Sequence, residues 1–434
     1  MTAPPTPPTR PSPFAAFAHP GFRAYIATRF LVTMSVQMLS AVVGFHVYAL
    51  THSARDLGYL GLAQFLPVML FSILAGQVAD KVDRRAVLLA CDLAFIASGV
   101  ALTLIARSPH PSVDAIFAVF ALIGVARAFY GPSGSSLLPS LVPTEDFTNA
   151  IAWQSTLWQA AAIGGPSLGG LAYGRAGSPE PVYLGTTIGF ALAGLLLVWI
   201  PRVESRAGAR EPATLATALA GVRYVAKNRI LLGAITLDFF AVFLGGATAL
   251  LPVYATDILH RDAASLGLMR ASPAIGAALT AAILAFRPLG RHTGRKMFVG
   301  VALFGAATLV FGLSRSYPLT LGALVVLGAA DMVSAVVRGT LIQSATPPEL
   351  RGRVSAVNMM FIGASNELGE FESGTLASWI GAVGSVVFGG VGTLAVVAIW
   401  AWRFPAIRNV DRLEQVRPPE PAEPSAASIT PSEP

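Results

Sequence analysis

The chain has 434 residues, of which 54% are hydrophobic and only 12% are charged, and its mean hydropathy is +0.63. A soluble domain carries about 25% charged residues, so this composition excludes a soluble globular protein. The net charge of +7 is typical of a membrane protein with basic cytoplasmic loops, and we expect no nucleic-acid partner. The single cysteine, Cys91, excludes an intrachain disulfide and is expected to be a buried apolar residue.

Both ends of the chain are rich in proline. Residues 1–20 lack the charged-then-apolar layout of a secretory signal, so we expect a disordered N-terminal arm. Residues 406–434 are expected to form a disordered C-terminal tail. Between these ends lie twelve apolar segments of roughly 20 residues, the length that crosses a bilayer as a helix. They run over residues 24–50, 57–79, 86–106, 113–138, 149–175, 181–200, 230–254, 264–286, 296–313, 317–341, 353–379 and 383–402.

Lysine and arginine are distributed unevenly between the two sides of these segments. With both termini on the cytoplasmic side, that side holds 21 of the 30 basic residues, the opposite side holds five, and four lie inside segments. Basic residues concentrate in cytoplasmic loops, so we predict an all-α membrane protein with twelve transmembrane helices and both termini cytoplasmic. The longest internal connection, 201–229, is expected to contain an amphipathic interfacial helix.

The chain contains an internal repeat. When it is shifted by 204 residues, "GVARAFYGPSGSSLLPSLVPTED" lies over "GAADMVSAVVRGTLIQSATPPEL" without a gap. Such a repeat predicts two pseudo-symmetric six-helix bundles, residues 21–200 and 230–405, joined by the linker 201–229. The matched pairs include Gly124 with Gly328, Glu145 with Glu349, Gly165 with Gly369 and Gly170 with Gly374.

Opposite charges fall at equivalent positions of the two halves. The shift of 204 places Arg127 over Asp331, and a shift of 209 places Arg29 over Asp238. A cavity between the halves would therefore have a cationic and an anionic wall. Arg127 either faces such a cavity or pairs with another buried charge, and the sequence leaves both alternatives open. Arg270, near the outer end of its segment, is expected to extend toward the membrane interface.

The segment 353–379 contains three glutamates, in "GASNELGEFESG". On a helix, Glu367 and Glu370 share one face, whereas Glu372 points elsewhere. A charged side chain such as Asp at the bilayer centre costs about 2.5–3.5 kcal/mol on insertion scales. Two acids with little hydration tend to share protons, so Glu367 and Glu370 are candidates for proton or substrate handling. The alternative is a structural acid that pairs with an arginine of a neighbouring helix.

The stretch "GQVADKVDRRAVL" joins the second and third segments. It resembles the signature loop of the major facilitator superfamily, in which an aspartate follows a glycine by four residues and a basic pair comes next. The residues of this candidate gating loop are Gly76, Asp80, Arg84 and Arg85. We expect the two arginines to anchor the loop at the anionic leaflet. In the corresponding loop of the second half, Arg291 stands where Asp80 would fall.

Two further motifs resemble parts of the same superfamily. "RAFYG", which begins at Arg127, resembles the arginine–glycine motif of its proton-coupled members. "GGPSLGG" resembles the glycine–proline motif of its exporters, which implies outward transport, although tight helix packing alone is an alternative. The residues of this packing motif are Gly165, Pro166, Gly169 and Gly170.

Over residues 20–405 the chain resembles the major facilitator superfamily, and more narrowly its branch of enterobactin exporters and related secretion proteins. The resemblance implies a multi-pass protein of the bacterial inner membrane that works by alternating access, and we expect it to be a monomer. It implies proton-coupled export of a small organic molecule, siderophore-like or hydrophobic and drug-like. Arg29 and Arg127 would then face an anionic substrate, and Asp238, Asp331, Glu367 and Glu370 would be the proton-carrier candidates.

Two other functions remain open at this point: an uptake carrier of the same fold, and a non-transporting membrane sensor or assembly protein. The sequence has no P-loop, no HExxH, no paired CxxC and no GxSxG. We therefore expect no enzymatic activity, metal or cofactor, and the expected partners are the small-molecule substrate, protons and membrane lipids. Energy would come from an ion gradient or from the substrate's own gradient.

Overall fold

The computed structural model describes residues 12–200, 215–287 and 289–412, and within these ranges the chain is helical and contains no β-strand. The longer helices are α1 Pro20–Thr51, α2 Ala54–Lys81, α3 Arg84–Arg107, α4 Val113–Leu137, α5 Phe147–Ala176, α6 Glu180–Leu197, α7 Leu215–Lys227, α8 Arg229–Leu244, α10 Ala263–Phe286, α11 Thr293–Leu313, α12 Tyr317–Ala345 and α13 Arg351–Arg403. Shorter turns are η1 Ala15–Ala18, η2 Leu138–Ser140, η3 Thr144–Asp146, η4 Ala247–Leu250, α9 Leu251–Val253, η5 Tyr254–Ile258, η6 Pro348–Leu350 and α14 Pro405–Arg408.

In the described ranges, nine helical segments are long and apolar enough to cross a membrane. One of them, Pro348–Arg403, has 56 residues and is broken at Gly381, where φ is +78°, so it covers two of the predicted segments. α2 and α5 also coincide with predicted segments, but they are not among the nine. The all-helical architecture agrees with the sequence, while the number of twelve crossings and their orientation stay predictions.

Large apolar side chains cover the outside of the molecule. Leu70, Phe286 and Trp379 are 77%, 89% and 77% exposed. Soluble monomers rarely expose so much apolar surface to water, whereas a lipid environment favours it. The surface therefore supports the membrane assignment independently of the hydropathy of individual helices.

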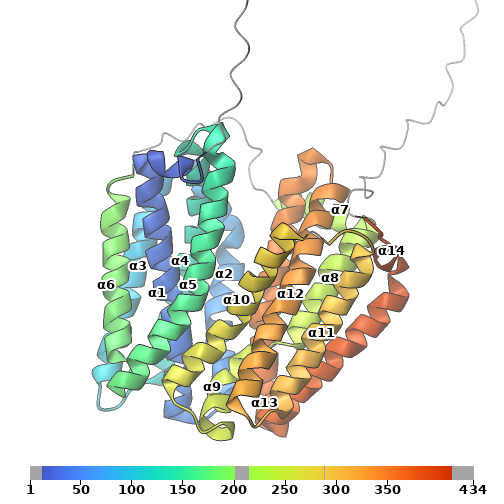
Figure 1. Ribbon diagram of the computed structural model, residues 1–434. Coiled ribbons are helices and arrows are strands. Elements are labelled where there is room, and N and C mark those ends of the chain that lie inside the picture. Colours follow the sequence, from blue (N-terminus) through green and yellow to red (C-terminus); the bar gives the residue numbers. More distant parts are fainter. Residues whose placement is uncertain (1–11, 201–214, 288, 413–434) are drawn as a thin grey trace, which may run out of the picture.

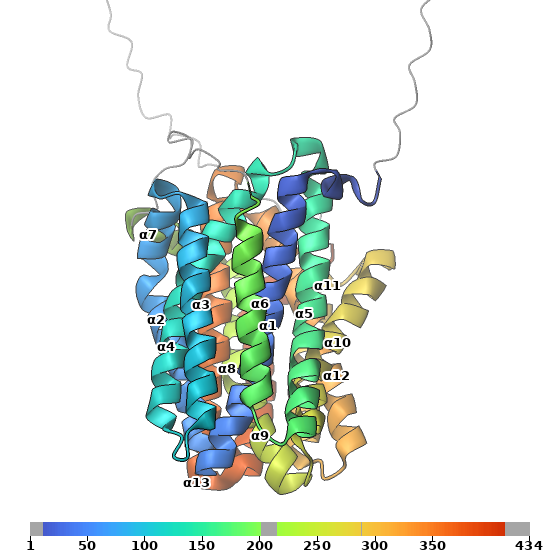
Figure 2. The ribbon, with the colours of Figure 1, turned by 90° about the vertical axis from the view of Figure 1, so that its left-hand side faces the viewer.

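The helices form two groups (Figure 1). The first group comprises α1–α6 and the second comprises α8–α14. Both described chain ends lie at one end of the molecule, which we call the terminal face, and the opposite end is the distal face (Figure 1). The two groups meet where α5 packs on α10 and where α2 packs on α13, and Figure 2 shows α5 running beside α10.

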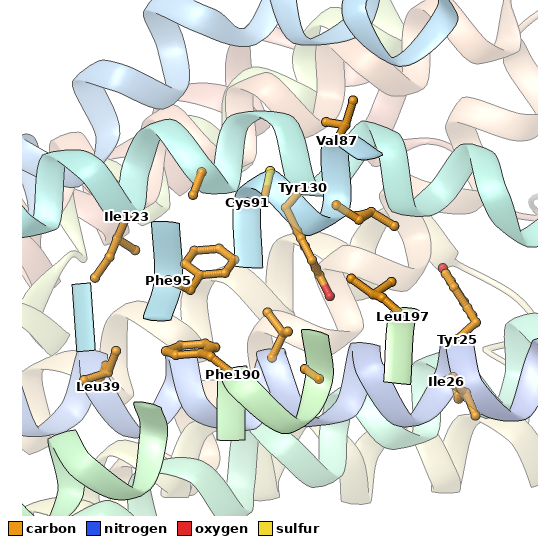
Figure 3. Close-up of a cluster of buried hydrophobic side chains, with 14 of the residues drawn as sticks. Tyr25, Ile26, Leu39, Val87, Cys91, Phe95, Ile123, Tyr130, Phe190 and Leu197 are labelled. Atoms are coloured by element: carbon orange, nitrogen blue, oxygen red, sulfur yellow. The ribbon is translucent and has the colours of Figure 1, made fainter. Parts of the chain in front are cut away.

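The core of the first group is aromatic. Figure 3 shows Phe95 of α3 facing Phe190 of α6, and their rings stack with centroids 5.2 Å apart. Tyr130 of α4 meets Phe95 edge-on at 5.7 Å, and Cys91 is buried in the same cluster as a free thiol. The expectation that Cys91 is a small buried residue is confirmed. The first helix group therefore has a hydrophobic core of its own.

The ends of the described chain are more ordered than the sequence suggested. In the N-terminal arm, Phe17 packs edge-on against Trp153 of α5 with ring centroids 5.0 Å apart, and the Pro13 carbonyl accepts a hydrogen bond from Trp153 Nε1 at 2.9 Å. Near the other end, Ile407 of α14 is fully buried. The prediction of disorder was therefore wrong for residues 12–20 and 406–412, because apolar burial and hydrogen bonds fix them. Residues 1–11, 201–214 and 413–434 lie outside the described ranges.

At the distal face the two groups touch through glycines. An added Cβ at Gly170 of α5 would lie 2.7 Å from Gly267 Cα and directly against the Ala263 carbonyl oxygen of α10. In addition, Tyr48 of α1 donates a hydrogen bond to Asp257 of η5 across the same boundary. Backbone-to-backbone contact of this kind requires residues without a side chain, so the distal face is closed by close helix packing.

The second distal contact repeats the first. An added Cβ at Gly374 of α13 would lie 2.7 Å from the Ala54 carbonyl oxygen and 2.9 Å from Gly58 Cα of α2. A shift of 209 residues carries Ala54 and Gly58 onto Ala263 and Gly267, the residues of the first contact. The internal repeat of the sequence therefore corresponds to equivalent backbone contacts on the two sides of the group boundary.

Candidate functional site

A cavity of about 940 Å³ lies between the two groups, toward the terminal face. α1, α4, η2 and α5 line one wall, and α10 and α12 line the other. Arg29 is the one charged residue among the described residues that line it, and Phe30, Phe147 and Trp158 provide aromatic surface. A mainly apolar wall with a few polar groups suits an amphipathic organic molecule.

A second cavity of about 370 Å³, which we call the floor pocket, continues from the first. The two share Trp158, Gln159 and Met332. The floor pocket differs in charge, because Arg270, Asp331 and Glu370 all line it, together with polar residues of α1 and α5. Ionisable groups from three helices of the second group thus meet residues of the first group at the base of the space between them.

Glu367 and Glu370 approach the same point on α2. An added Cβ at Gly61 would lie 3.1 Å from Glu370 Oε2 and 3.6 Å from Glu367 Oε2, so the two carboxyl groups meet where α2 has no side chain. The guanidinium groups of Arg127 and Arg270 lie within electrostatic reach of this pair. The sequence prediction that Glu367 and Glu370 share a face agrees with this geometry, and their role in proton handling stays a proposal.

Glu372 is separate from the pair, as its helical phase predicted. Ser373 Oγ donates a hydrogen bond to its Oε2 at 3.3 Å, whereas the three atoms nearest to the Cβ added at Gly61 belong to Glu367 and Glu370. The three glutamates of this segment are therefore not equivalent.

The two aspartates of the second group have different surroundings. Asp238 of α8 forms an ion pair with Arg338 of α12, and both side chains are buried. Asp331 lies on the same helix as Arg338 and lines the floor pocket. The charges of both Asp238 and Arg338 act on its carboxyl group. The geometry favours Asp331, rather than Asp238, as the carboxyl group that faces the cavity.

The buried ion pair leads to a stability prediction. Replacing Arg338 by Met leaves the Asp238 carboxyl group buried without its partner, so we expect the free energy of unfolding to fall by about 3–5 kcal/mol. The double replacement Asp238→Leu with Arg338→Met removes both charges and should recover most of that loss. Denaturant unfolding of the detergent-purified protein measures both values. A double variant as unstable as the single variant would contradict this assignment.

The two arginines of the first group do not form one cationic wall. Arg29 lines the larger cavity and its guanidinium lies over the Tyr130 ring, 4.9 Å from the centroid. Arg127 instead donates from Nη1 to Gln64 Oε1 at 2.6 Å and is not among the residues that line either cavity. Of the pair expected to face an anionic substrate, the structure places only Arg29 on a cavity wall.

Arg270 is a further candidate site residue, which the sequence placed at the membrane interface instead. Its guanidinium does not extend to the interface but lies against α1, where Nη1 is 3.4 Å from Ser40 Oγ. A signal was present, because Ala263, Gly267 and Arg270 follow helical spacing and share the face of α10 that contacts the first group. In the repeat, Arg270 also corresponds to Gly61, which meets the glutamate pair.

The candidate gating loop lies at the terminal face. Gly76 is half-buried in α2, and the side chain of Asp80 lies outside the described part of the chain. Arg85 donates to the carbonyl oxygens of Ile200 and Val198 at 3.0 and 2.9 Å, just beyond the end of α6. Exposed carbonyls at a helix C-terminus attract a cation, which explains this contact, and the anchoring of Arg85 at the anionic leaflet stays a prediction.

Arg84, the other member of the basic pair, has a different environment from Arg85. Its side chain is half-buried, and its Nε atom is buried without a hydrogen-bond partner among the described residues. The anchoring role expected for it at the leaflet stays a prediction.

The residues of the packing motif lie where α5 contacts two other helices. Gly165 and Gly169 face α1, because an added Cβ would lie 3.0 Å from the Met34 carbonyl oxygen and 3.2 Å from the Met38 carbonyl oxygen, respectively. Gly170 faces α10 in the distal closure, and Pro166 lines the floor pocket. Tight packing is therefore present, and outward transport stays a proposal.

Comparison with known proteins adds three findings. The sequence profile of the major facilitator superfamily matches residues 25–370. An enterobactin exporter of Citrobacter koseri is 26% identical over 392 residues, which cover 87% of this chain and 86% of the relative. An enterobactin exporter of Escherichia coli O1:K1 is also 26% identical, over 394 residues with the same coverage.

Solved structures share the fold at low identity. A transporter of the POT family, in complex with 5-aminolevulinic acid, is 12% identical with a TM-score of 0.70, covering 90% of this chain and 97% of the other. A bacterial homologue of the human lysosomal transporter Spinster, inward-facing and occupied, is 14% identical with a TM-score of 0.68, covering 92% and 96%. Apolar helices in two groups, paired glycine contacts and a profile that matches most of the chain agree: the chain belongs to the major facilitator superfamily.

Proposed function

We propose that this protein exports a small organic molecule in exchange for protons by alternating access. The observation that carries the proposal is the meeting of Glu367 and Glu370 at Gly61 of α2, with Glu370 lining the floor pocket between two helix groups that are closed at the distal face. The terminal face would be cytoplasmic, in a bacterial inner membrane, and the protein would act as a monomer. The larger cavity would then receive its substrate from the cytoplasm.

The proton step follows from the surroundings of the pair. Two carboxylates that meet at one point, with restricted access to water, repel each other and favour a shared proton. Arg127 and Arg270 oppose this repulsion, so the pair can lose its proton when the cavity is hydrated. Substrate that enters beside Glu370 would change the same balance, which couples its binding to proton release.

The substrate class follows from the cavity and from the relatives. The larger cavity combines aromatic side chains, the amide side chains of Gln154 and Gln159, and one cation, Arg29. Such a wall suits a molecule with aromatic rings and several hydrogen-bonding groups. Enterobactin, which the names of the two relatives give as their cargo, is one example of that chemistry, and hydrophobic drug-like molecules are another.

The test is efflux from bacterial cells that lack other exporters, with iron-free enterobactin and ethidium as probes. We expect cells that make the protein to export at least one probe, and a protonophore to stop that export. Accumulation of the probe in right-side-out vesicles, but not in inverted vesicles, would instead indicate uptake. If neither probe moves in any preparation while a stable protein partner is recovered, the non-transporting alternative would be favoured.

A further inference from the structure

The second half of the chain lacks the acids that the first half has in its candidate gating loop. In the aligned loops, Arg291 stands in place of Asp80, and Gly294 stands in place of Asp83. In the first group, Asp83 is the N-cap of α3 and accepts a hydrogen bond from Arg85 N at 3.0 Å. Gly294 has no side chain for this purpose, so the N–H groups at the start of α11 need acceptors from elsewhere.

The C-terminal segment, residues 404–411, supplies these acceptors. Asp411 Oδ1 accepts a hydrogen bond from His292 N at 3.0 Å, and the Val410 carbonyl accepts one from Gly294 N at 3.0 Å. The Asp411 carbonyl accepts a third from the intervening amide at 3.1 Å. Three consecutive N–H groups at the start of α11 are thus satisfied by two residues that follow the last long helix.

The Asp411 side chain also pairs with the side chains of the loop. Its Oδ2 accepts from Arg291 Nε at 3.2 Å, and its Oδ1 lies 2.6 Å from His292 Nδ1. The hydrogen bond from the His292 backbone, helped by Arg291, holds the pKa of Asp411 below its usual value. The group is therefore ionised at neutral pH, the form that a helix N-terminus favours.

Two glycines let the segment lie close to its neighbours. Gly294 of α11 faces the Ile407 carbonyl, and an added Cβ would overlap it. Gly233 of α8 faces Phe404, with an added Cβ 2.7 Å from its ring, and it also faces Ile407. The segment is thus packed on both α8 and α11, immediately after α13 ends.

We propose that Asp411 is the acid of a second gating loop, supplied by the C-terminal segment, and that it positions the ends of α10 and α11 at the terminal face. α10 lines both cavities and contacts α5 of the first group, and its end leads into the loop that Asp411 binds. A firm connection at this point makes α10 move together with α11 and α13. The consequence for transport rate rests on the proposed function, whereas the positioning itself does not.

The test compares three variants of the full-length protein. Asp411→Asn removes the charge, and Arg291→Asp combined with Asp411→Asn returns an acid to the loop at the position that the first half uses. Glu349→Gln, an exposed loop acid elsewhere at the terminal face, is the control. Hydrogen–deuterium exchange of residues 289–296 is measured in detergent, and enterobactin efflux in cells.

For Asp411→Asn we expect exchange of residues 289–296 to rise by about two- to fivefold, because the amide oxygen can still accept from His292 N but the charge that Arg291 and the helix N-terminus attract is lost. The maximal efflux rate should fall by a similar factor, with an unchanged KM, because the cavity residues are intact. The double variant should recover both, and Glu349→Gln should match the wild type. Unchanged exchange in Asp411→Asn, or no recovery in the double variant, would overturn the proposal. If the wild type exports no probe, the proposed function fails and the exchange data alone decide the role of Asp411.

Discussion

Replacing Glu367 and Glu370 together by glutamine is expected to abolish proton-driven accumulation of substrate while exchange of substrate across the membrane continues. Glutamine keeps the size and the hydrogen-bonding capacity of the side chain but carries no proton to release. Without that proton, the protein still binds substrate and changes conformation but no longer draws energy from the gradient. One charge moving through 100 mV is worth about 2.3 kcal/mol, so uphill transport should disappear.

The measurement uses proteoliposomes with an imposed proton gradient. Uphill accumulation of substrate is recorded first, and then counterflow of labelled against unlabelled substrate without a gradient. Glu372→Gln is the matched control, because it lies on the same helix but outside the pair. Accumulation that persists in the double variant at the wild-type level would remove these residues from the proton pathway, and Asp331 would become the leading candidate.

Much of this site was predictable because helices impose strict geometry. The spacing of Glu367 and Glu370 placed both on one face, and the same spacing separated Glu372. The repeat placed Gly170 and Gly374 at equivalent positions, and they make equivalent contacts. These predictions needed only the sequence, since each depends on the order of residues along one helix or on internal symmetry.

What the sequence did not determine were the contacts between helices. Arg270 was assigned to the interface from its depth along one helix, although its neighbours on α1 hold it at the floor pocket. Likewise, Asp238 was grouped with Asp331, but its buried pairing with Arg338 depends on how α8 packs against α12. Whether a carboxyl group is paired depends on how its helix packs against others, and the spacing of residues along one helix does not predict that packing.

Pairing across long stretches of chain was the least predictable feature. Residues 406–411 were predicted to be the start of a disordered tail, because neither hydropathy nor charge marks them as a segment that packs on other helices. The hydrogen bond between Asp411 and His292 depends on the packing of α11 against α13, which brings the two residues together. Local sequence patterns around His292 cannot predict a hydrogen-bond acceptor that lies more than a hundred residues away in the chain.

The distal closure gives the second large expected effect, at Gly374. Replacing Gly374 by Val places methyl groups where the backbone of α2 now lies, because an added Cβ would already be 2.7 Å from the Ala54 carbonyl oxygen. This contact joins the two groups and is not part of either group's core, so each group should still fold. Overpacking costs about 1–3 kcal/mol, and the cost applies only to the state with a closed distal face. The conformational equilibrium should then shift by roughly 5- to 150-fold toward a distally open state.

Spin labels measure this shift directly. Cysteines introduced at Arg55 and Ser378, which are exposed on opposite groups near the distal face, can be labelled in a Cys91→Ser background. We expect Gly374→Val to lengthen the distance between the labels and to reduce transport. Gly363→Val is the matched control for the distance, because an added Cβ at Gly363 on the same helix meets nothing within 4 Å. An unchanged label distance in Gly374→Val would mean that α2 yields to the new side chain, and the glycine contacts would then not control distal opening.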